Sequence, residues 1–306
     1  MSAKRDFLSV DDLAPTEMLW LLDEADAIKA RPETAAERIA GRQVLLIFEK
    51  PSTRTRVSFE VAVTSMGGHA IVLRSDELQW GRGETIQDTG RVLSAYADAI
   101  VLRTFEQDRL EQLAEAAGVP VINALSDFSH PCQALADLQT IREQKGKLDG
   151  LALAYLGDGN NVAHSLMFAG AKAGMDVRVA SPPGYEPSVQ VAERSGLIGA
   201  ETGGRTTVTN VVAEAVSGAD ILYTDVWASM GQESESGERA EVLGRYRLDG
   251  DAVELAAADA IVMHCLPAHR GEEIAAEVFD GPQSVVWDQA ANRLHTQKAL
   301  LAWLLT

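Results

Sequence analysis

The side chains best suited to chemistry lie between residues 49 and 60, where a polar stretch links an apolar run to a helical pattern. Ser-Thr-Arg-Thr at 52–55 follows the apolar residues 44–48 and precedes apolar positions at helical spacing. A helix start leaves about four backbone N–H groups unpaired and carries a partial positive charge. Hydroxyl groups and a guanidinium add donors that fit phosphate oxygens. The stretch therefore predicts a phosphate site, with an ordinary capped helix and solvated arginines as the alternative.

Three more polar side chains follow predicted strands in the first half of the chain. The strands are expected at residues 69–73, 99–102 and 119–122, and the side chains beyond them are those of Gln79, Arg103 and His130. In a parallel sheet covered by helices, ligands bind beyond the carboxyl ends of the strands. We therefore expect these side chains to converge on the ligand held by residues 52–55.

The second half repeats the alternation of strands and helices. The turn Gly-Asp-Gly-Asn-Asn at 157–161 follows a predicted strand, and Asp225 and His264 follow two others. The Gly-x-Gly turn alone invites a dinucleotide-binding interpretation. That interpretation is disfavoured because Val162 replaces the third glycine and Ser181 stands where the next strand would need an acid. A tight turn between strand and helix is the preferred interpretation.

The alternation predicts an α/β protein with two doubly wound parallel-sheet domains joined by long helices. Residues 1–130 together with 291–306 are expected to form the first domain, residues 131–150 a linking helix, and residues 151–290 the second domain. A strand is expected at 285–287. The last helix, 293–304, is apolar on one side and is expected to pack back on the first domain.

Composition excludes several classes of protein. The 306 residues carry a formal net charge of −18, from 45 acidic against 27 basic residues, so no basic face for nucleic acid is expected. No apolar run approaches the roughly 20 residues that span a bilayer, and no basic and apolar leader begins the chain, so we expect no membrane partner and a cytoplasmic location. The acidic, lysine-poor surface suggests adaptation to high salt, an idea that full activity in dilute buffer would refute.

The two cysteines, Cys132 and Cys265, lie far apart in the sequence and each is near a histidine. A disulfide is disfavoured in a chain without an export signal, and each site offers too few ligands for structural zinc. We expect two free thiols. No metal or cofactor is called for.

Four motifs taken together resemble one known family. They are Ser-Thr-Arg-Thr at 52–55, His-Pro-Cys-Gln at 130–133, Asp-x-Trp-x-Ser-Met-Gly at 225–231 and His-Cys-Leu-Pro at 264–267. Their order and spacing resemble the aspartate/ornithine carbamoyltransferase family over essentially the whole chain, and the last two motifs point to ornithine among the family's substrates. The resemblance implies transfer of the carbamoyl group of carbamoyl phosphate to the side-chain amine of L-ornithine, giving L-citrulline and phosphate. It also implies a homotrimer or a multiple of trimers.

The resemblance also implies roles for individual residues. The carbamoyl phosphate site would comprise Ser52, Thr53, Arg54 and Thr55 at the phosphate, Gln79 from a neighbouring subunit, Arg103, His130 and Gln133 at the carbamoyl group, and Cys265, Leu266 and Arg293 at the reacting centre. The ornithine site would comprise Asn161 and Met230 at the carboxylate, Asp225 and Ser229 at the α-amino group, and Cys265 near the reacting amine. The catalytic residues would be Arg54, Arg103, His130 and Cys265.

Three alternatives remain. The first is a carbamoyltransferase that uses aspartate, putrescine or an acylated ornithine, and the loop at Arg82 and Gly83 resembles the aspartate enzyme as much as the ornithine enzyme. The second is a nucleotide-dependent oxidoreductase. The third is a non-catalytic protein on the same fold, which would not need Arg103, His130 and Arg293 together.

Overall fold

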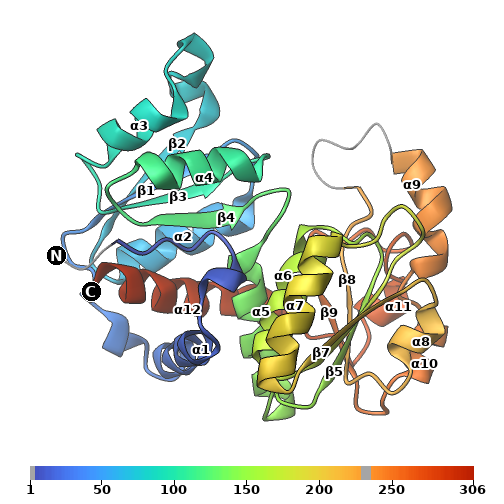
Figure 1. Ribbon diagram of the computed structural model, residues 1–306. Helices are drawn as coiled ribbons and strands as arrows, with labels where there is room; N and C mark the ends of the chain where they lie inside the picture. The colour runs from blue at the N-terminus through green and yellow to red at the C-terminus, as the bar shows by residue number, and fades with distance from the viewer. Residues whose placement is uncertain (1–3, 229–235) are drawn as a thin grey trace. The chain divides into compact units, whose positions relative to one another are not determined.

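The computed structural model describes residues 4–228 and 236–306, which form two compact units. Unit 1 comprises Met1–Ala136 and Asn292–Thr306, and unit 2 comprises Asp137–Ala291. The divisions fall inside two helices, α5 (Pro131–Lys145) and α12 (Val286–Leu305). Each unit is a parallel sheet flanked by helices (Figure 1). The predicted fold class, two doubly wound α/β domains, is thereby confirmed.

Unit 1 contains a four-stranded parallel sheet in the order β2-β1-β3-β4. The strands are β1 (Gln43–Phe48), β2 (His69–Arg74), β3 (Ala99–Arg103) and β4 (Val121–Leu125). The helices before α5 are α1 (Pro15–Ala30), α2 (Thr53–Ser65), α3 (Ile86–Leu93) and α4 (Gln107–Ala116). Leu45 and Leu102 of the sheet pack with Leu110 and Leu113 of α4 in one core layer. Figure 1 shows α2 and α12 on the opposite face of this sheet.

The C-terminal helix α12 packs against other helices of unit 1, as the sequence predicted. The Lys29 Nζ at the end of α1 donates a hydrogen bond to Asn292 Oδ1 of α12 (2.7 Å). Leu300 and Leu301 near the end of α12 are fully buried. The apolar side of the helix is therefore buried in the core of unit 1.

Unit 2 contains a five-stranded parallel sheet in the order β7-β6-β5-β8-β9. The strands are β5 (Ala152–Leu156), β6 (Asp176–Ala180), β7 (Arg205–Thr209), β8 (Ile221–Thr224) and β9 (Ile261–His264). The helices are α6 (Asn161–Lys172), α7 (Val189–Thr202), α8 (Val212–Val216), α9 (Ser236–Leu243), α10 (Gly250–Leu255) and α11 (Ala276–Phe279). Helix α6 packs on α7, while residues of α8, α10 and α11 share one core cluster with the sheet.

The strand orders locate a switch point in each sheet. In unit 1 the chain runs outward from β1 to β2 and then returns to β3 on the other side of β1. In unit 2 the same reversal separates β5 from β8. Ligands of open α/β sheets bind where the loops diverge at such a reversal. The loops that matter are therefore those after β1 and β3 in unit 1, and those after β5 and β8 in unit 2.

The predicted strand at 285–287 is wrong. Beside this segment, Ser284 forms an isolated β-bridge with Val262. Helix α12 begins at Val286 instead of at residue 293. The run Val-Val-Trp favours a strand by composition, but strand propensity depends strongly on packing context. Here Val286 is fully buried in the core of unit 2, and the helix continues from it.

Two other strands differ from expectation. Strand β7 was not predicted, because its sequence, Arg-Thr-Thr-Val-Thr, lacks the apolar run of a central strand. It lies at the edge of the sheet, where it pairs with β6 alone and its side chains are at most partly buried. Strand β4 runs from Val121 to Leu125 instead of 119–122, so it carries the chain closer to His130.

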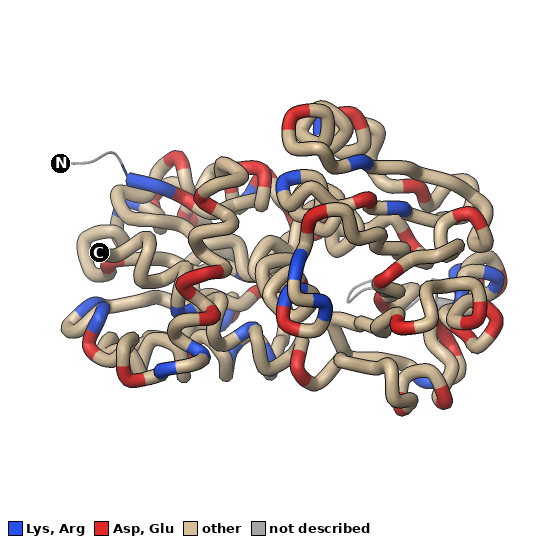
Figure 2. Tube along the Cα trace, turned by 90° about the horizontal axis from the view of Figure 1, so that it is seen from below, with Lys and Arg blue, Asp and Glu red and all other residues tan. Residues whose placement is uncertain are grey.

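The acidic residues are distributed over both units and interspersed with basic ones (Figure 2).

Within the described residues, no helix is long and apolar enough to cross a membrane. Both cysteines are free thiols, as predicted, with Cys132 buried and Cys265 partly buried.

Candidate active site

The start of α2 in unit 1 carries an exposed arginine and no acidic residue. Ser52 is the N-cap, and its Oγ accepts a hydrogen bond from the Thr55 N–H (3.3 Å). The first turn contains no acidic residue, although acids are the residues that the helix dipole favours there. Arg54 is exposed and makes no hydrogen bond or ion pair with the described residues. An uncompensated guanidinium beside unpaired N–H groups is suited to binding an anion.

A buried hydrogen-bonded cluster joins three helices of unit 1. Arg293 of α12 donates from Nη1 to Gln133 Oε1 of α5 (2.8 Å) and from Nη2 to Thr55 Oγ1 of α2 (3.1 Å). All three side chains are at most 4% exposed. Arg293 therefore fixes the Thr55 hydroxyl and the Gln133 amide, which are 78 positions apart in sequence, in one arrangement.

Arg103 and His130 lie at the carboxyl ends of the neighbouring strands. Arg103 is the last residue of β3 and is buried, and its carbonyl accepts the Glu49 N–H (2.9 Å), which ties the loop after β1 to β3. His130 precedes α5 and is also buried. Burial, reinforced by the guanidinium groups of Arg293, Arg103 and Arg54, lowers the pKa of His130 well below 6.5. The structure thus gathers three arginines around a neutral imidazole.

This depressed pKa makes a prediction about stability. Below about pH 6.5 the unfolded chain takes up a proton at His130 that the folded chain does not, so the free energy of unfolding falls as the pH is lowered. Denaturant unfolding between pH 5 and 6.5 should show a smaller slope in His130→Gln than in the natural chain, by up to about 1.4 kcal/mol per pH unit. Substitution of the exposed His69 by Gln is the matched control. Equal slopes for the natural chain and His130→Gln would contradict the prediction.

Gln79 does not join this cluster. It is exposed on the loop after β2, its side-chain oxygen accepts from Arg82 Nη1 (3.3 Å), and its carbonyl accepts from the N–H groups of Arg82 and Glu84. Thr53, the first residue of α2, is exposed at the helix start.

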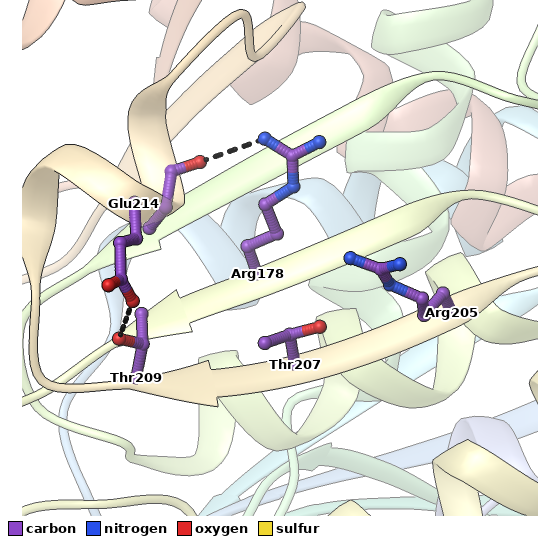
Figure 3. A pocket seen from close by; sticks show the side chains of 6 residues that line it. Arg178, Arg205, Thr207, Thr209 and Glu214 are labelled. Carbon is purple, nitrogen blue, oxygen red and sulfur yellow. Dashed lines mark hydrogen bonds between the residues drawn. The ribbon is translucent and has the colours of Figure 1, made fainter.

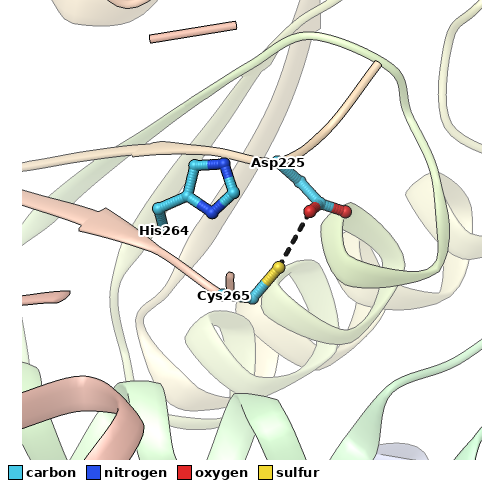
Figure 4. A group of neighbouring side chains, drawn as sticks. All are labelled: Asp225, His264 and Cys265. Atoms are coloured by element: carbon cyan, nitrogen blue, oxygen red, sulfur yellow. Dashed lines mark hydrogen bonds between the residues drawn. The ribbon is translucent and has the colours of Figure 1, made fainter. Parts of the chain in front are cut away.

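In unit 2 the loops at the switch point meet at Asp225. Asp225 follows β8 and is buried; its Oδ2 accepts from Asn160 Nδ2 (2.8 Å) and its Oδ1 accepts from the Cys265 thiol (2.8 Å). Figure 4 shows the thiol and carboxylate pointing toward one another from neighbouring loops. The thiol is the donor in this hydrogen bond.

Asn160 was missed by the sequence analysis, which selected Asn161. Asn160 is the N-cap of α6, where its Oδ1 accepts from the Val162 N–H (2.9 Å), and its amide nitrogen remains available for Asp225. Asn161 is the first residue of the helix and is buried. An Asx residue before an apolar run is an N-cap signal that the sequence does contain. Ser229 and Met230 lie outside the described residues.

A second missed pair supports the same turn. Arg239 of α9 donates from Nη1 to Asp158 Oδ2 (2.7 Å) and to the Trp227 carbonyl (3.1 Å). It thereby holds the loop after β5 against the loop after β8. A side chain built on Gly159 would come within 2.2 Å of the Pro187 nitrogen, so this glycine serves close packing. That requirement accounts for the Gly-x-Gly turn without a dinucleotide.

The backbone between Cys265 and Pro267 is held in an unusual conformation. Leu266 has φ 62°, in a left-handed region that non-glycine residues occupy rarely and often at functional sites. The Leu266 N–H donates to His264 Nδ1 (2.9 Å), and His264 Nε2 bonds to Glu273 Oε1 (3.1 Å). Burial raises the pKa of Glu273, but hydrogen bonds from His264 and the His269 N–H outweigh burial and lower it.

Asp225, His264 and Cys265 have potential ligand atoms within 4.8 Å of one another (Figure 4). Both nitrogens of His264 are already hydrogen-bonded, one to Glu273 and one to the Leu266 N–H. A metal would have to break one of these bonds before the imidazole could coordinate it. The geometry therefore favours a positioning role for His264.

A separate hollow of about 230 Å³ lies over β6 and β7 and is lined by Arg178, Arg205, Thr207, Thr209 and Glu214 (Figure 3). Arg178 donates to the Ser217 carbonyl (2.8 Å) and pairs with Asp176 (2.8 Å). Glu214 accepts from Thr209 (2.8 Å). Its central arginine already stabilises the end of α8, so this hollow is not prepared for an anion.

Comparison with known proteins covers nearly the whole chain. The family model described as "Aspartate/ornithine carbamoyltransferase, carbamoyl-P binding domain" matches residues 5–143, and the model described as "Aspartate/ornithine carbamoyltransferase, Asp/Orn binding domain" matches residues 149–304. The chain is 64% identical over 304 residues to an ornithine carbamoyltransferase of Parafrankia sp., covering 98% of this chain and 96% of the relative. The corresponding protein of Pyrococcus abyssi is 53% identical over 306 residues, with the same coverage of each.

Solved structures show the same likeness. An ornithine carbamoyltransferase from Pyrococcus furiosus superposes with a TM-score of 0.95 at 52% identity, covering 99% of this chain and 97% of the other. The structure from Gloeobacter violaceus gives a TM-score of 0.90 at 48% identity and covers all of both chains.

Proposed function

The chain belongs to the aspartate/ornithine carbamoyltransferase family, and on that premise we propose how its residues carry out the reaction. The protein transfers the carbamoyl group of carbamoyl phosphate to the side-chain amine of L-ornithine, giving L-citrulline and phosphate. The observation that carries the proposal is the Arg54 guanidinium, which makes no hydrogen bond or ion pair with the described residues and lies at a helix start that contains no acid.

Carbamoyl phosphate is assigned to unit 1. Ser52, Thr53, Arg54 and Thr55 bind the phosphate, and Arg103, His130 and Gln133 bind the carbamoyl group. The donor-rich helix start and the Arg293, Gln133 and Thr55 cluster support this assignment. Residues 1–130 with 291–306 would form this binding domain, followed by the linking helix 131–150. Gln79, whose hydrogen bonds stay within its own loop, is assigned to the site of a neighbouring subunit.

Ornithine is assigned to unit 2, within residues 151–290. Asn161 and the Met230 backbone bind the carboxylate, and Asp225 and Ser229 bind the α-amino group. The buried Asp225 carboxylate at the switch point supports the assignment. Its hydrogen bonds with the described residues come from the Asn160 amide and the Cys265 thiol, neither of which is a cation, so its negative charge still favours a cationic partner. Cys265, the Leu266 carbonyl and Arg293 are assigned to the reacting groups.

The chemistry needs a neutral amine to attack the carbonyl carbon while charge builds on the carbonyl oxygen and phosphate leaves. Arg103, the Thr55 hydroxyl and the N–H of a neutral His130 are donors suited to that oxygen. Such a donor contributes about 3–4 kcal/mol to lowering the barrier in comparable sites. An amine like that of lysine, with a pKa of about 10.4, is mostly protonated at neutral pH, so activity should rise toward alkaline pH. The reaction requires no metal or covalent intermediate.

One assay tests the function directly. Purified protein with carbamoyl phosphate and ornithine should form citrulline and phosphate in equal amounts, and putrescine, aspartate and an acylated ornithine serve as competing substrates. Preference for any of these three would overturn ornithine as the substrate. The grouping of Asp225 with Asn160 favours a substrate that carries a free α-amino group beside a carboxylate. Putrescine is a diamine and has no such α-amino acid group.

Cys265 is proposed to place the amine and not to attack the substrate, because its thiol donates to Asp225. Cys265→Ser should lose at most about tenfold in kcat, since a hydroxyl also donates and one hydrogen bond contributes about 0.5–1.5 kcal/mol. Steady-state kinetics and mass spectrometry of the quenched enzyme check this. Complete inactivation together with a trapped carbamoyl adduct on the natural enzyme would refute it.

Three broader assignments are also proposals. A homotrimer is supported by Val57 and Val61, which α2 leaves exposed, and sedimentation showing a monomer would refute it. A cytoplasmic location rests on the sequence expectation alone and is tested by fractionation of cells. Adaptation to high salt is supported by the charge of −18 and is refuted by undiminished activity in dilute buffer.

A further inference from the structure

The turn after β9 brings a histidine and two carboxylates together. Gly271, with φ +89°, allows a tight turn in which the Glu272 N–H donates to the His269 carbonyl (2.9 Å) and the Gly271 N–H to the Ile274 carbonyl (2.8 Å). His269 Nδ1 lies 4.0 Å from Glu272 Oε2 and 3.6 Å from Glu273 Oε2. His269 and Glu272 are exposed, whereas Glu273 is fully buried.

Glu273 offers an oxygen that the described residues do not satisfy. Its Oε1 accepts from the His269 N–H (2.6 Å) and bonds to His264 Nε2 (3.1 Å). Its Oε2 is buried and has no hydrogen-bond partner among the described residues, although it faces the His269 ring. A buried carboxylate oxygen without a hydrogen bond is costly, so it needs a positively charged or donating partner.

The spacing of the three atoms suits a metal ion. Bonds of about 2.0–2.2 Å to one tetrahedral ion place neighbouring ligand atoms about 3.3–3.6 Å apart. The two distances from His269 Nδ1, 3.6 and 4.0 Å, are close to that spacing, and all three atoms lie within 4.8 Å of one another. Imidazole with two carboxylates is a donor set for divalent first-row transition ions.

We propose that His269, Glu272 and Glu273 bind a divalent transition-metal ion of the Zn²⁺ type, with water completing its coordination. The site is distinct from the reacting groups, and carbamoyl transfer does not pass through it. Glu273 would then link the ion to His264, which in turn holds the Leu266 N–H. An ion at this turn would stiffen the backbone that carries Cys265 and Leu266.

The nearby arginines do not replace the ion. Arg270 forms two hydrogen bonds with Asp280 (2.9 and 2.8 Å), and Arg247 donates to the Gly271 carbonyl (3.3 Å). Neither guanidinium bonds to Glu272 or Glu273. The competing interpretation is an ion pair between a protonated His269 and the two carboxylates, which needs no metal.

The experiment uses Zn²⁺ and the full chain carrying Cys265→Ser, so that the thiol cannot bind the ion. Calorimetric titration is expected to show one Zn²⁺ per chain. His269→Ala in this background should weaken Zn²⁺ binding by at least about tenfold. Removing even a residue that only hydrogen-bonds to a metal ligand typically weakens metal binding by about that factor. Glu272→Ala should act in the same direction. The matched controls, His69→Ala and Glu277→Ala, replace exposed residues of the same types and should leave binding unchanged.

Circular dichroism of each variant confirms that it is folded before titration. Absence of Zn²⁺ binding to the Cys265→Ser chain would show an ion pair only and overturn the proposal. Binding that His269→Ala does not weaken would place the ion elsewhere and overturn it equally. Because the measurement is binding and not citrulline formation, either failure leaves the proposed transferase function untouched.

Discussion

Replacing Arg54 with glutamine is expected to lower kcat by about 10²–10³-fold, the loss typical when one donor to developing charge is removed. The proposed leaving group is phosphate, and Arg54 is the cation at the helix start with no hydrogen bond or ion pair to the described residues. For the same reason the substitution should leave the free energy of unfolding within about 0.5 kcal/mol of the natural value. Steady-state kinetics and thermal unfolding measure the two effects.

Arg56 provides the matched control for Arg54. It lies on the same helix, is exposed, and pairs with Glu60 (2.8 Å) one turn further on. An exposed pair of this kind contributes only about 0.3–0.5 kcal/mol to stability, so Arg56→Gln should fold normally. Because Arg56 already pairs with Glu60 and is not assigned to the phosphate, the variant should also retain nearly full kcat. If both variants lose activity equally, Arg54 has no special role at the phosphate, and the helix start is merely a basic surface.

Asp225→Asn is expected to reduce kcat/KM for ornithine by about 30-fold or more, corresponding to the roughly 2–5 kcal/mol lost when one partner of a buried charge pair is removed. The amide has the same shape as the carboxylate, and its single oxygen can still accept from the Asn160 amide, although it no longer offers a second oxygen to the Cys265 thiol. Because the shape and one hydrogen bond remain, the fold should survive. The negative charge that would attract the cationic α-amino group is lost.

The selectivity of this loss is the informative part. KM for carbamoyl phosphate should change little, because the assigned phosphate residues lie in unit 1. Asp251→Asn, an exposed substitution on α10, is the control and should keep both constants. Equal weakening of both substrates in Asp225→Asn would indicate a general disturbance of the fold and refute a specific ornithine contact.

The placement of many candidate site residues could be predicted because ligands in this fold bind at the carboxyl ends of strands. The apolar runs before residues 52, 103 and 225 locate strands by local pattern alone, and a parallel sheet aligns their carboxyl ends. Position in sequence relative to a strand therefore stands in for position in space. The same local reasoning failed at 285–287, because burial of Val286 in the core outweighed its strand propensity.

The sequence by itself predicted the fold class, the free thiols and which polar residues follow the carboxyl ends of the strands. Each of these depends on neighbouring residues or on composition. Only the tertiary structure decided that Arg293 bonds to Thr55, 238 positions away, and that Asn160 reaches Asp225. It also decided that His130 is neutral, because burial and three guanidinium groups act on it together. Long-range packing sets side-chain direction, partner and desolvation, and no local pattern records those quantities.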